Sequence, residues 1–210
     1  MRFLVLILAL FTLANSAPQS SGIIRVRLET SAGNIVLALD AKRAPKTAAN
    51  FLAYVDDGRL DGTEFYRATR RKADPRFGFI QGGIGTDARR MLPPLVLEPT
   101  SQTGIKHLDG TVSMAHGPNE NAANANFSIM VGPNPGLDAR PGNRGFAAFG
   151  RVIAGMDVVR RILALPTGGG RDAMKGQMIL KPVKLIRAVR LDGVAKPSAR
   201  VKPWLIGPQR

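Results

Sequence analysis

The segment EFYRATRRKADPRFGFIQGG, residues 64–83, holds two short apolar runs, Phe65 to Arg67 and Phe79 to Gln81, around a basic, proline-containing loop. Aromatic runs bounded by Gly and Pro are typical of β-strands, so we expect two strands joined by a mobile loop. Arg67 has five N–H donors in a fixed fork and Gln81 both donates and accepts, so the pair could grip a peptide backbone. Composition alone would favour a simpler interpretation, a surface arginine and a glutamine at a strand end.

Length and composition indicate one globular domain with appendages. The chain has 210 residues, of which 44% are hydrophobic and 21% charged, and its 23 glycines and 15 prolines favour a β-rich fold over a helical bundle. The absence of cysteine excludes disulfides, a thiolate nucleophile and cysteine-ligated metals. The two histidines, His107 and His116, are too few for a typical histidine-based metal cluster. We therefore expect no metal and no cofactor.

Residues 1–17 have the pattern of a secretory signal peptide. Arg2 supplies the positive charge, an apolar run covers residues 3–13, and small residues occupy positions 14–17. The apolar run is short for a membrane span, so an uncleaved N-terminal anchor is the lesser alternative. We expect an exported protein, periplasmic or secreted, in which residues 18–22 are a short leader before the folded domain.

The strongest bias in composition is basic, with a formal net charge of +15. Such an excess favours anionic partners through long-range steering. For an exported protein these would be anionic envelope components or acidic proteins, and a solvated basic surface without a dedicated ligand is the simpler alternative. No basic run interleaved with aromatic residues is present, so we expect no dedicated nucleic-acid site.

The hydrophobic pattern predicts most of the secondary structure. Besides the two runs above, we expect strands over residues 23–30, 35–39, 110–115, 127–131, 146–153 and 183–191. Helical spacing predicts one helix that begins near Pro45 and ends near Gly58, and another over residues 156–163. Three glycines at 168–170 are interpreted as a flexible connection, and residues 192–210 as a loose, basic, proline-containing tail. Seven or eight strands with two helices suggest an antiparallel barrel.

Eight short motifs follow one another along this pattern. They are SAGNIVLALD (31–40), APKTAANFLAYV (44–55), FYR (65–67), IQGG (80–83), GTVSMA (110–115), LD (137–138), FAAFGRV (146–152) and GMDVV (155–159). In order and spacing they resemble the cyclophilin family of peptidyl-prolyl isomerases. The resemblance covers about residues 23–191 and implies one mainly β domain, an eight-stranded antiparallel β-barrel capped by two α-helices.

In that family, the arginine that follows the Phe-aromatic pair and the glutamine that precedes Gly-Gly lie in the proline-binding groove. They correspond to Arg67 and Gln81. Rotation about an X–Pro bond removes amide resonance against a barrier of about 18–20 kcal/mol, and the proline nitrogen regains a lone pair. A guanidinium directed at that nitrogen would stabilise the twisted state more than either planar isomer. The resemblance therefore implies catalysis by Arg67 with Gln81 on proline-containing polypeptides, without a nucleophile or cofactor.

Other groove positions of the family show both matches and differences. Gly78, Ser128 and Gly136 stand where aromatic residues are usual, and each loss would remove roughly 1.5–3 kcal/mol of apolar contact. Phe77, in a loop longer than usual, is a candidate to refill this space. Backbone near His116 is expected to pair with the peptide, and Asn126 replaces a glutamine. The expected substrate-binding residues are Phe79, Ala115, His116, Asn126, Ser128, Leu137 and Phe146.

We therefore expect an exported, monomeric prolyl isomerase that assists folding outside the cytoplasm. The alternative is a module of the same fold that is catalytically weak or inactive and binds extended or acidic partners through its basic surface. A hydrolase interpretation of Ser113 with His116 is disfavoured, because we find no acidic partner and no nucleophile elbow. The sequon at Asn126 lies in an expected strand and is interpreted as chance.

Overall fold

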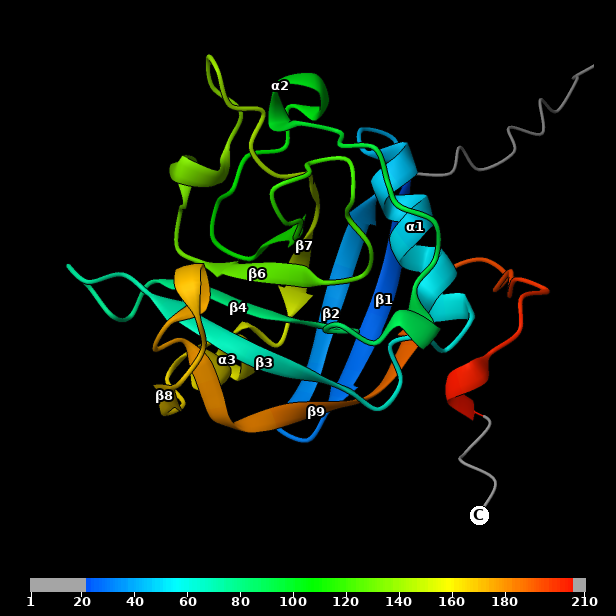
Figure 1. The fold of residues 1–210 in the computed structure, drawn as a ribbon. Coiled ribbons are helices and arrows are strands. Elements are labelled where there is room, and N and C mark those ends of the chain that lie inside the picture. Colours follow the sequence, from blue (N-terminus) through cyan, green and yellow to red (C-terminus); the bar gives the residue numbers. More distant parts are fainter. Residues whose placement is uncertain (1–21, 206–210) are drawn as a thin grey trace, which may run out of the picture.

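The structure is a computed structural model that describes residues 22–205 (Figure 1). The expected signal peptide lies outside the described residues, so its assignment stays a prediction. Within residues 22–205, no helix is long and apolar enough to cross a membrane.

Eight antiparallel strands close into a barrel in the order β1-β2-β7-β5-β6-β4-β3-β9, and β9 pairs back onto β1. A two-residue strand, β8 (Thr167–Gly168), adds to the start of β9. This arrangement confirms the mainly β, eight-stranded barrel. The barrel strands are β1 (Ile23–Thr30), β2 (Gly33–Asp40), β3 (Thr63–Arg70), β4 (Gly78–Gly83), β5 (Thr111–Met114), β6 (Phe127–Val131), β7 (Ala148–Ala154) and β9 (Met178–Arg190).

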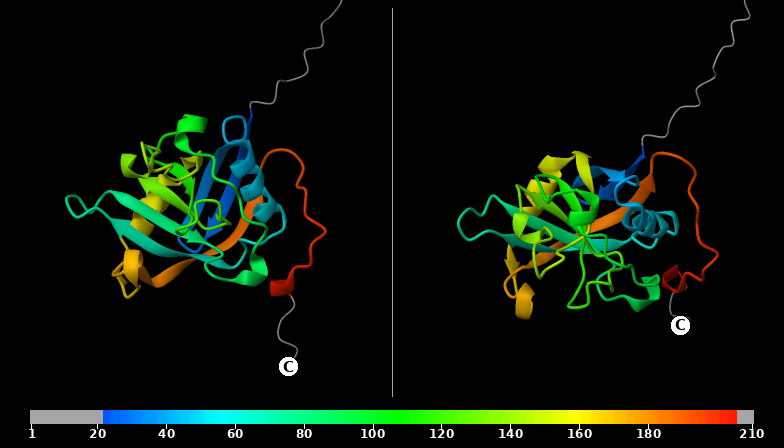
Figure 2. Two further views of the ribbon diagram at one scale, coloured as in Figure 1. Left: turned by 45° about the horizontal axis from the view of Figure 1, so that its top comes forward. Right: turned by 90° about the horizontal axis from the view of Figure 1, so that it is seen from above.

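Two helices cover the barrel on opposite sides, as expected (Figures 1 and 2). α1 (Pro45–Asp56) begins at Pro45, whose fixed φ suits a first helical position, and Gly58 follows its end with a φ of 67°. α3 (Met156–Leu163) buries Val158, Val159, Ile162 and Leu163. The remaining helical pieces are short: α2 (Thr100–Thr103), η1 (Ala88–Arg90), η2 (Pro135–Leu137), η3 (Asp172–Met174) and η4 (Pro203–Leu205).

The interior of the barrel is filled by aromatic rings. Phe51 of α1 lies 5.2 Å from the ring of Phe127 and 5.3 Å from that of Phe149, and Phe65 meets Phe127 at 5.6 Å. All four side chains are fully buried, which stabilises the fold by about 1.5–3 kcal/mol for each ring. Ligands must therefore bind on the outside of this barrel, along its strands and loops.

The segment between β3 and β4 is shorter than the loop we expected. Both strands extend further than the two apolar runs, so that Arg70 pairs with Gly78. The connecting residues close on themselves, because Arg71 N donates to Phe77 O at 2.9 Å and Phe77 N donates to Asp74 O at 3.1 Å. Figure 1 shows the result as a hairpin that projects beyond the barrel.

The C-terminal segment is docked on the domain, which corrects the expectation of a loose tail for residues 192–205. It runs along the outside of α1 (Figure 2), where Lys196 N donates to Asp56 Oδ2 at 3.0 Å. Ser198 donates to the buried carboxylate of Asp57 from both its N and its Oγ, at 2.5 and 2.6 Å. The ring of Trp204 then lies 4.5 Å from the guanidinium carbon of Arg59.

Candidate active site

Arg67 and Gln81 face each other across two neighbouring strands. They are direct partners in the β3–β4 register, and Arg67 Nη1 donates to Gln81 Oε1 at 2.8 Å. The register shifts between Phe65 and Arg67, so Tyr66 is an extra residue in a β-bulge. The bulge lets Tyr66 reach the same side chain, since Gln81 Nε2 donates to Tyr66 Oη at 3.0 Å. Two consecutive residues of β3 thus hold one glutamine.

The guanidinium of Arg67 is half-buried and has two further partners in the segment just before β9. Gln177 Oε1 accepts from Arg67 Nε at 2.9 Å and from Nη2 at 2.7 Å, and Ala173 O accepts from Nη2 at 3.1 Å. The ring of Phe79 lies 5.2 Å from its guanidinium carbon. Burial lowers the pKa of Arg67, but an arginine remains protonated at neutral pH. The site therefore presents a fixed, partly desolvated positive charge.

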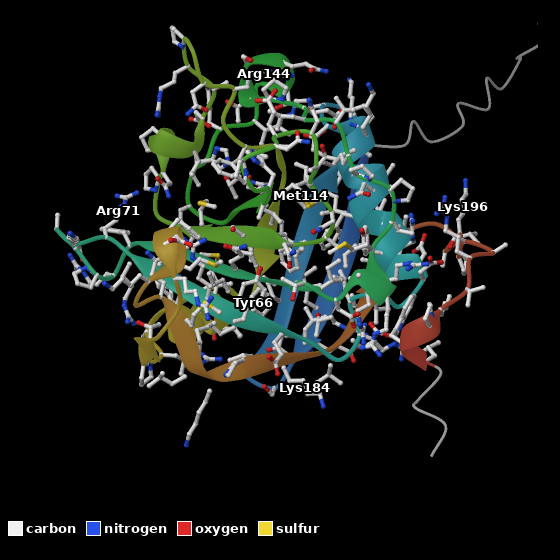
Figure 3. All side chains as sticks on the ribbon, in the orientation of Figure 1. Tyr66, Arg71, Met114, Arg144, Lys184 and Lys196 are labelled. Carbon is white, nitrogen blue, oxygen red and sulfur yellow. The ribbon has the colours of Figure 1, made fainter. Side chains whose placement is uncertain are left out.

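A chain of hydrogen bonds continues from Gln81 through Tyr66, labelled in Figure 3, to Asn126 at the start of β6. Tyr66 Oη donates to Asn126 Oδ1 at 3.1 Å, and Gly85 N donates to the same oxygen at 2.8 Å. Asn126 Nδ2 donates to Gly85 O and to Asn124 Oδ1. The amide of Asn126 is thus linked through Tyr66 to the Arg67–Gln81 pair, and its predicted contact with substrate stays a prediction.

The other expected groove residues form a second group beside the first. The rings of His116 and Phe146 stack at 4.3 Å, and Phe146 N donates to Leu137 O at 3.0 Å. Both nitrogens of His116 lie within 3.0 Å of backbone carbonyl oxygens. Ala115 N donates to Asn126 O at 2.8 Å, which joins this group to the hydrogen-bonded chain above.

Strand pairing completes the connection between the two groups. Ser128 on β6 is the register partner of Gln81 on β4 and of Ser113 on β5, and Ser128 and Gln81 are 7% and 9% exposed. The structure therefore places all the sequence-predicted site residues along one strip that crosses β3, β4, β6 and β5 and ends in the 137–146 loop. Which of them touch substrate stays a prediction.

The positions that have lost aromatic side chains are explained only in part. A Cβ on Gly78 would lie 1.9 Å from Thr69 O, and the residue has a φ of 150°, so the local backbone admits glycine alone. Phe77 packs against Gly132, where a Cβ would lie 2.4 Å from its ring. Gly132 is four residues beyond Ser128, about 13 Å along an extended chain. Phe77 therefore does not fill the space beside Ser128, contrary to our expectation.

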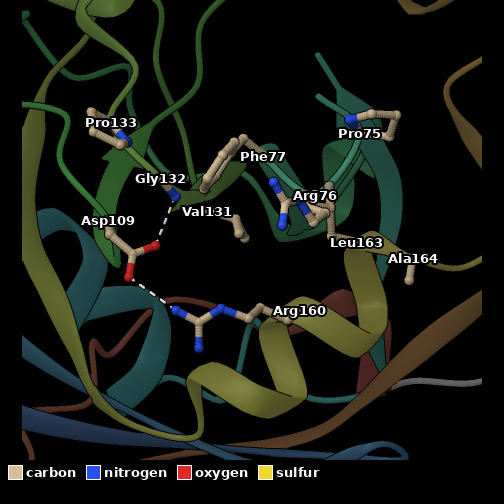
Figure 4. Close-up of a pocket in the computed structure, with 10 residues that line it drawn as sticks. All are labelled: Pro75, Arg76, Phe77, Asp109, Val131, Gly132, Pro133, Arg160, Leu163 and Ala164. Atoms are coloured by element: carbon tan, nitrogen blue, oxygen red, sulfur yellow. Dashed lines mark hydrogen bonds and ion pairs between the residues drawn. The ribbon is translucent and has the colours of Figure 1, made fainter. Parts of the chain in front are cut away.

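Phe77 instead lines a pocket of about 630 Å³ between the β3–β4 hairpin and α3 (Figure 4). Its two arginines already have carboxylate partners: Arg160 pairs with Asp109 at 3.1 Å and Arg76 pairs with Asp74 at 2.8 Å. None of the predicted site residues lines this pocket, so it is separate from the Arg67 site. Its lining residues are Pro75, Arg76, Phe77, Asp109, Val131, Gly132, Pro133, Arg160, Leu163 and Ala164.

A buried serine, histidine and aspartate form a second polar row. Ser113 Oγ lies 2.8 Å from Nε2 of His107, and His107 Nδ1 lies 2.7 Å from Asp138 Oδ1. The serine thus pairs with His107 rather than His116, and an acidic partner is present, which corrects our expectation on both points. Ser113 is only 2% exposed and His107 is fully buried, so no substrate reaches them. Burial lowers the pKa of His107, which favours a neutral, structural imidazole.

Comparison with known proteins agrees with this geometry. The family model described as cyclophilin type peptidyl-prolyl cis-trans isomerase/CLD matches residues 25–188. The chain therefore belongs to the cyclophilin-type peptidyl-prolyl cis-trans isomerase family, and its activity class is that of a prolyl isomerase.

Two relatives illustrate the match. Peptidyl-prolyl cis-trans isomerase A of Dickeya dadantii is 33% identical over 186 residues, which cover 87% of this chain and 94% of the relative. Peptidyl-prolyl cis-trans isomerase cyp18 of Streptomyces antibioticus is 38% identical over 167 residues, 77% of this chain and 98% of the relative. A crystal structure of a Cryptosporidium parvum cyclophilin type isomerase shares the fold, with a TM-score of 0.62 at 22% identity over 82% of this chain and 99% of the other.

Sequence reasoning missed three residues of this site. Gln177 follows Arg67 by 110 positions, and no spacing rule connects a glutamine after a glycine-rich loop with an arginine so far away. Thr69 donates to the same oxygen of Gln177 at 2.6 Å, and Tyr66 joins the site through a bulge. The one available signal was that Tyr66 is a polar aromatic residue next to the arginine.

Proposed function

We propose that this protein is an exported prolyl isomerase that assists the folding of proline-containing polypeptides, in which Arg67 stabilises the twisted X–Pro amide and Gln81 positions the substrate. The observation that carries the proposal is the half-buried guanidinium of Arg67, which Gln81 holds at 2.8 Å beside the ring of Phe79. A donor fixed before the substrate binds acts on the twisted state without the cost of reorganisation.

Arg67 can supply only part of the rate acceleration of an isomerase. One charge-assisted hydrogen bond contributes roughly 1.5–3 kcal/mol, which corresponds to about a ten- to hundredfold rate difference. The rest of the acceleration must come from apolar contacts that hold the proline ring, and Phe79, Leu137 and Phe146 are the proposed sources. Their side chains are partly exposed in the structure, as a binding surface requires.

The test is isomerisation of a short Xaa-Pro peptide, together with a refolding reaction limited by proline isomerisation. We expect Arg67→Ala to lower kcat/KM about ten- to hundredfold and Arg67→Lys to restore only a small part, since lysine lacks the planar fork. Arg76→Ala is the matched control, because Arg76 is exposed in the turn beyond the last β3–β4 pair, whereas Gln81 pairs with Arg67. Equal activity of Arg67→Ala and wild type would refute the mechanism. Negligible acceleration by both would favour the alternative, a non-catalytic binding module.

Export is supported by the pattern of residues 1–17, and the +15 charge suits anionic envelope components as partners of an exported protein. N-terminal sequencing of the protein recovered outside the cytoplasm should show cleavage close to residue 17. Binding to anionic vesicles that weakens strongly between low and high salt would support an envelope partner. A protein recovered in the cytoplasm with residues 1–17 intact would contradict export.

A further inference from the structure

The guanidinium of Arg67 has nearly all of its donors occupied by the protein itself. Of its five N–H bonds, Nε–H goes to Gln177, both hydrogens of Nη2 go to Gln177 and Ala173, and one hydrogen of Nη1 goes to Gln81. Among partners within residues 22–205, this leaves a single N–H, on Nη1, without an acceptor. A substrate therefore meets one donor whose direction is set by the other four bonds.

We propose that Gln177 is a positioning residue of the isomerase, and that it fixes the direction of the remaining Nη1–H of Arg67. The inference rests on the proposed role of Arg67. Gln81 holds the guanidinium at Nη1, whereas Gln177 holds it at the Nε and Nη2 edge with one oxygen. Contacts at both edges of a planar group prevent it from turning about the Cδ–Nε bond, which a single contact would allow.

The side-chain oxygen of Gln177 is itself fixed. Thr69 Oγ1 donates to it at 2.6 Å, so three donors converge on one amide oxygen. The backbone of Gln177 is held on both sides, because Ala68 N donates to Gln177 O at 3.0 Å and Gln177 N donates to Met174 O at 3.0 Å. Gln177 therefore cannot follow Arg67 if the guanidinium moves, which is what a positioning residue requires.

The glycine-rich loop of residues 168–176 places Gln177 beside Arg67, so it is more than the flexible connection that we expected. Gly176 N donates to Gly169 O at 2.5 Å, which closes residues 169–176 into a ring. A Cβ on Gly170 would lie 2.3 Å from Met174 O, and Gly170 has a φ of 77°, so a side chain there would open the loop. The same closure brings Ala173 O to within 3.1 Å of Arg67 Nη2.

The test uses the full chain and three variants of Gln177. Gln177→Met keeps the shape but cannot accept strong hydrogen bonds, and Gln177→Ala is a second loss variant in case the first misfolds. Gln177→Glu keeps the acceptors. We expect both loss variants to lower kcat about tenfold with KM changed less than twofold, and Gln177→Glu to stay within threefold of wild type. Gln102→Ala, an exposed glutamine of α2, is the matched control.

Two further readouts separate positioning from a structural role. In NMR spectra, the Nε–H resonance of Arg67 should be sharp and protected from exchange with water in wild type and Gln177→Glu. In the loss variants it should be broadened by rapid exchange with water. In an Arg67→Ala background, Gln177→Met should cause no additional loss, because the group it positions is gone.

The outcomes distinguish this inference from the proposed function. If Arg67→Ala lowers activity but folded Gln177→Met stays within twofold of wild type with an unchanged Nε–H resonance, the role of Gln177 is refuted and that of Arg67 stands. Additive losses in the double variant would likewise refute positioning. If Arg67→Ala has no effect, the proposed catalytic role itself fails.

Discussion

Replacement of Ser198 by alanine should destabilise the domain although Ser198 lies in the C-terminal segment, outside the barrel. Its Oγ donates to Asp57 Oδ2 at 2.6 Å, and the Asp57 side chain is fully buried beside Arg59. A hydrogen bond to a charged group contributes about 1.5–3 kcal/mol, and the carboxylate left behind cannot turn to water. For a domain of this size the loss corresponds to a fall in Tm of about 3–12 °C.

The effect should depend on pH with a defined sign. Burial by itself raises the pKa of Asp57. Hydrogen bonds from Ser198 and Arg59 lower it by more than burial raises it, so the folded-state pKa lies below the usual value. The stabilisation is therefore present above about pH 4, where the unfolded carboxylate ionises, and disappears as the pH falls through the folded-state pKa. The destabilisation by Ser198→Ala should shrink over that range.

Urea unfolding followed by circular dichroism measures both quantities. Ser101→Ala is the control, since Ser101 is an exposed serine of α2, and it should change the free energy of unfolding by less than about 0.5 kcal/mol. If Ser198→Ala matches this control at pH 7, the docked C-terminal segment does not stabilise the domain in solution. A penalty of the same size at pH 3 and pH 7 would also refute the assignment to Asp57.

Three further predictions concern the barrel and its polar row. Gly78→Ala should cost well over 1 kcal/mol of stability, because its Cβ would lie 1.9 Å from Thr69 O. Thermal unfolding of this variant is compared with that of Gly117→Ala, whose Cβ would meet no atom within 4 Å. Burial lowers the pKa of His107, so wild type should lose stability as the pH falls below about 6.5, where the unfolded histidine binds a proton. The free energy of unfolding, measured from pH 8 to 5, should show this loss in wild type and not in His107→Gln. Finally, a serine-directed phosphonate should not label Ser113, which is 2% exposed, and labelling detected by mass spectrometry would contradict the structural role.

The sequence was sufficient for elements whose pattern is local. The bounds expected for residues 23–30, 127–131 and 156–163 agree with β1, β6 and α3, because alternation and helical spacing are set by which face of each element is buried. α1 likewise begins at the expected Pro45. The barrel then followed from the order of the motifs.

Contacts between distant residues could not be predicted in this way. The bulge at Tyr66 depends on how β3 pairs with both β4 and β9, and no local feature of the sequence marks it. Gln177 and Ser198 owe their roles to partners 110 and 141 positions away. Phe77 shows the reverse error, since proximity in sequence to Gly78 suggested a place in the groove that the strand register does not give it.

The pairing of β1 with β9 has a consequence for biosynthesis. The first strand of the domain has β9 as one of its two neighbours, and Leu28 lies opposite Ala188. A nascent chain therefore leaves that edge of β1 unpaired until residues 178–190 have been synthesised. Closure of the barrel therefore waits for β9, the last barrel strand to be made, and one edge of the first strand stays open until then.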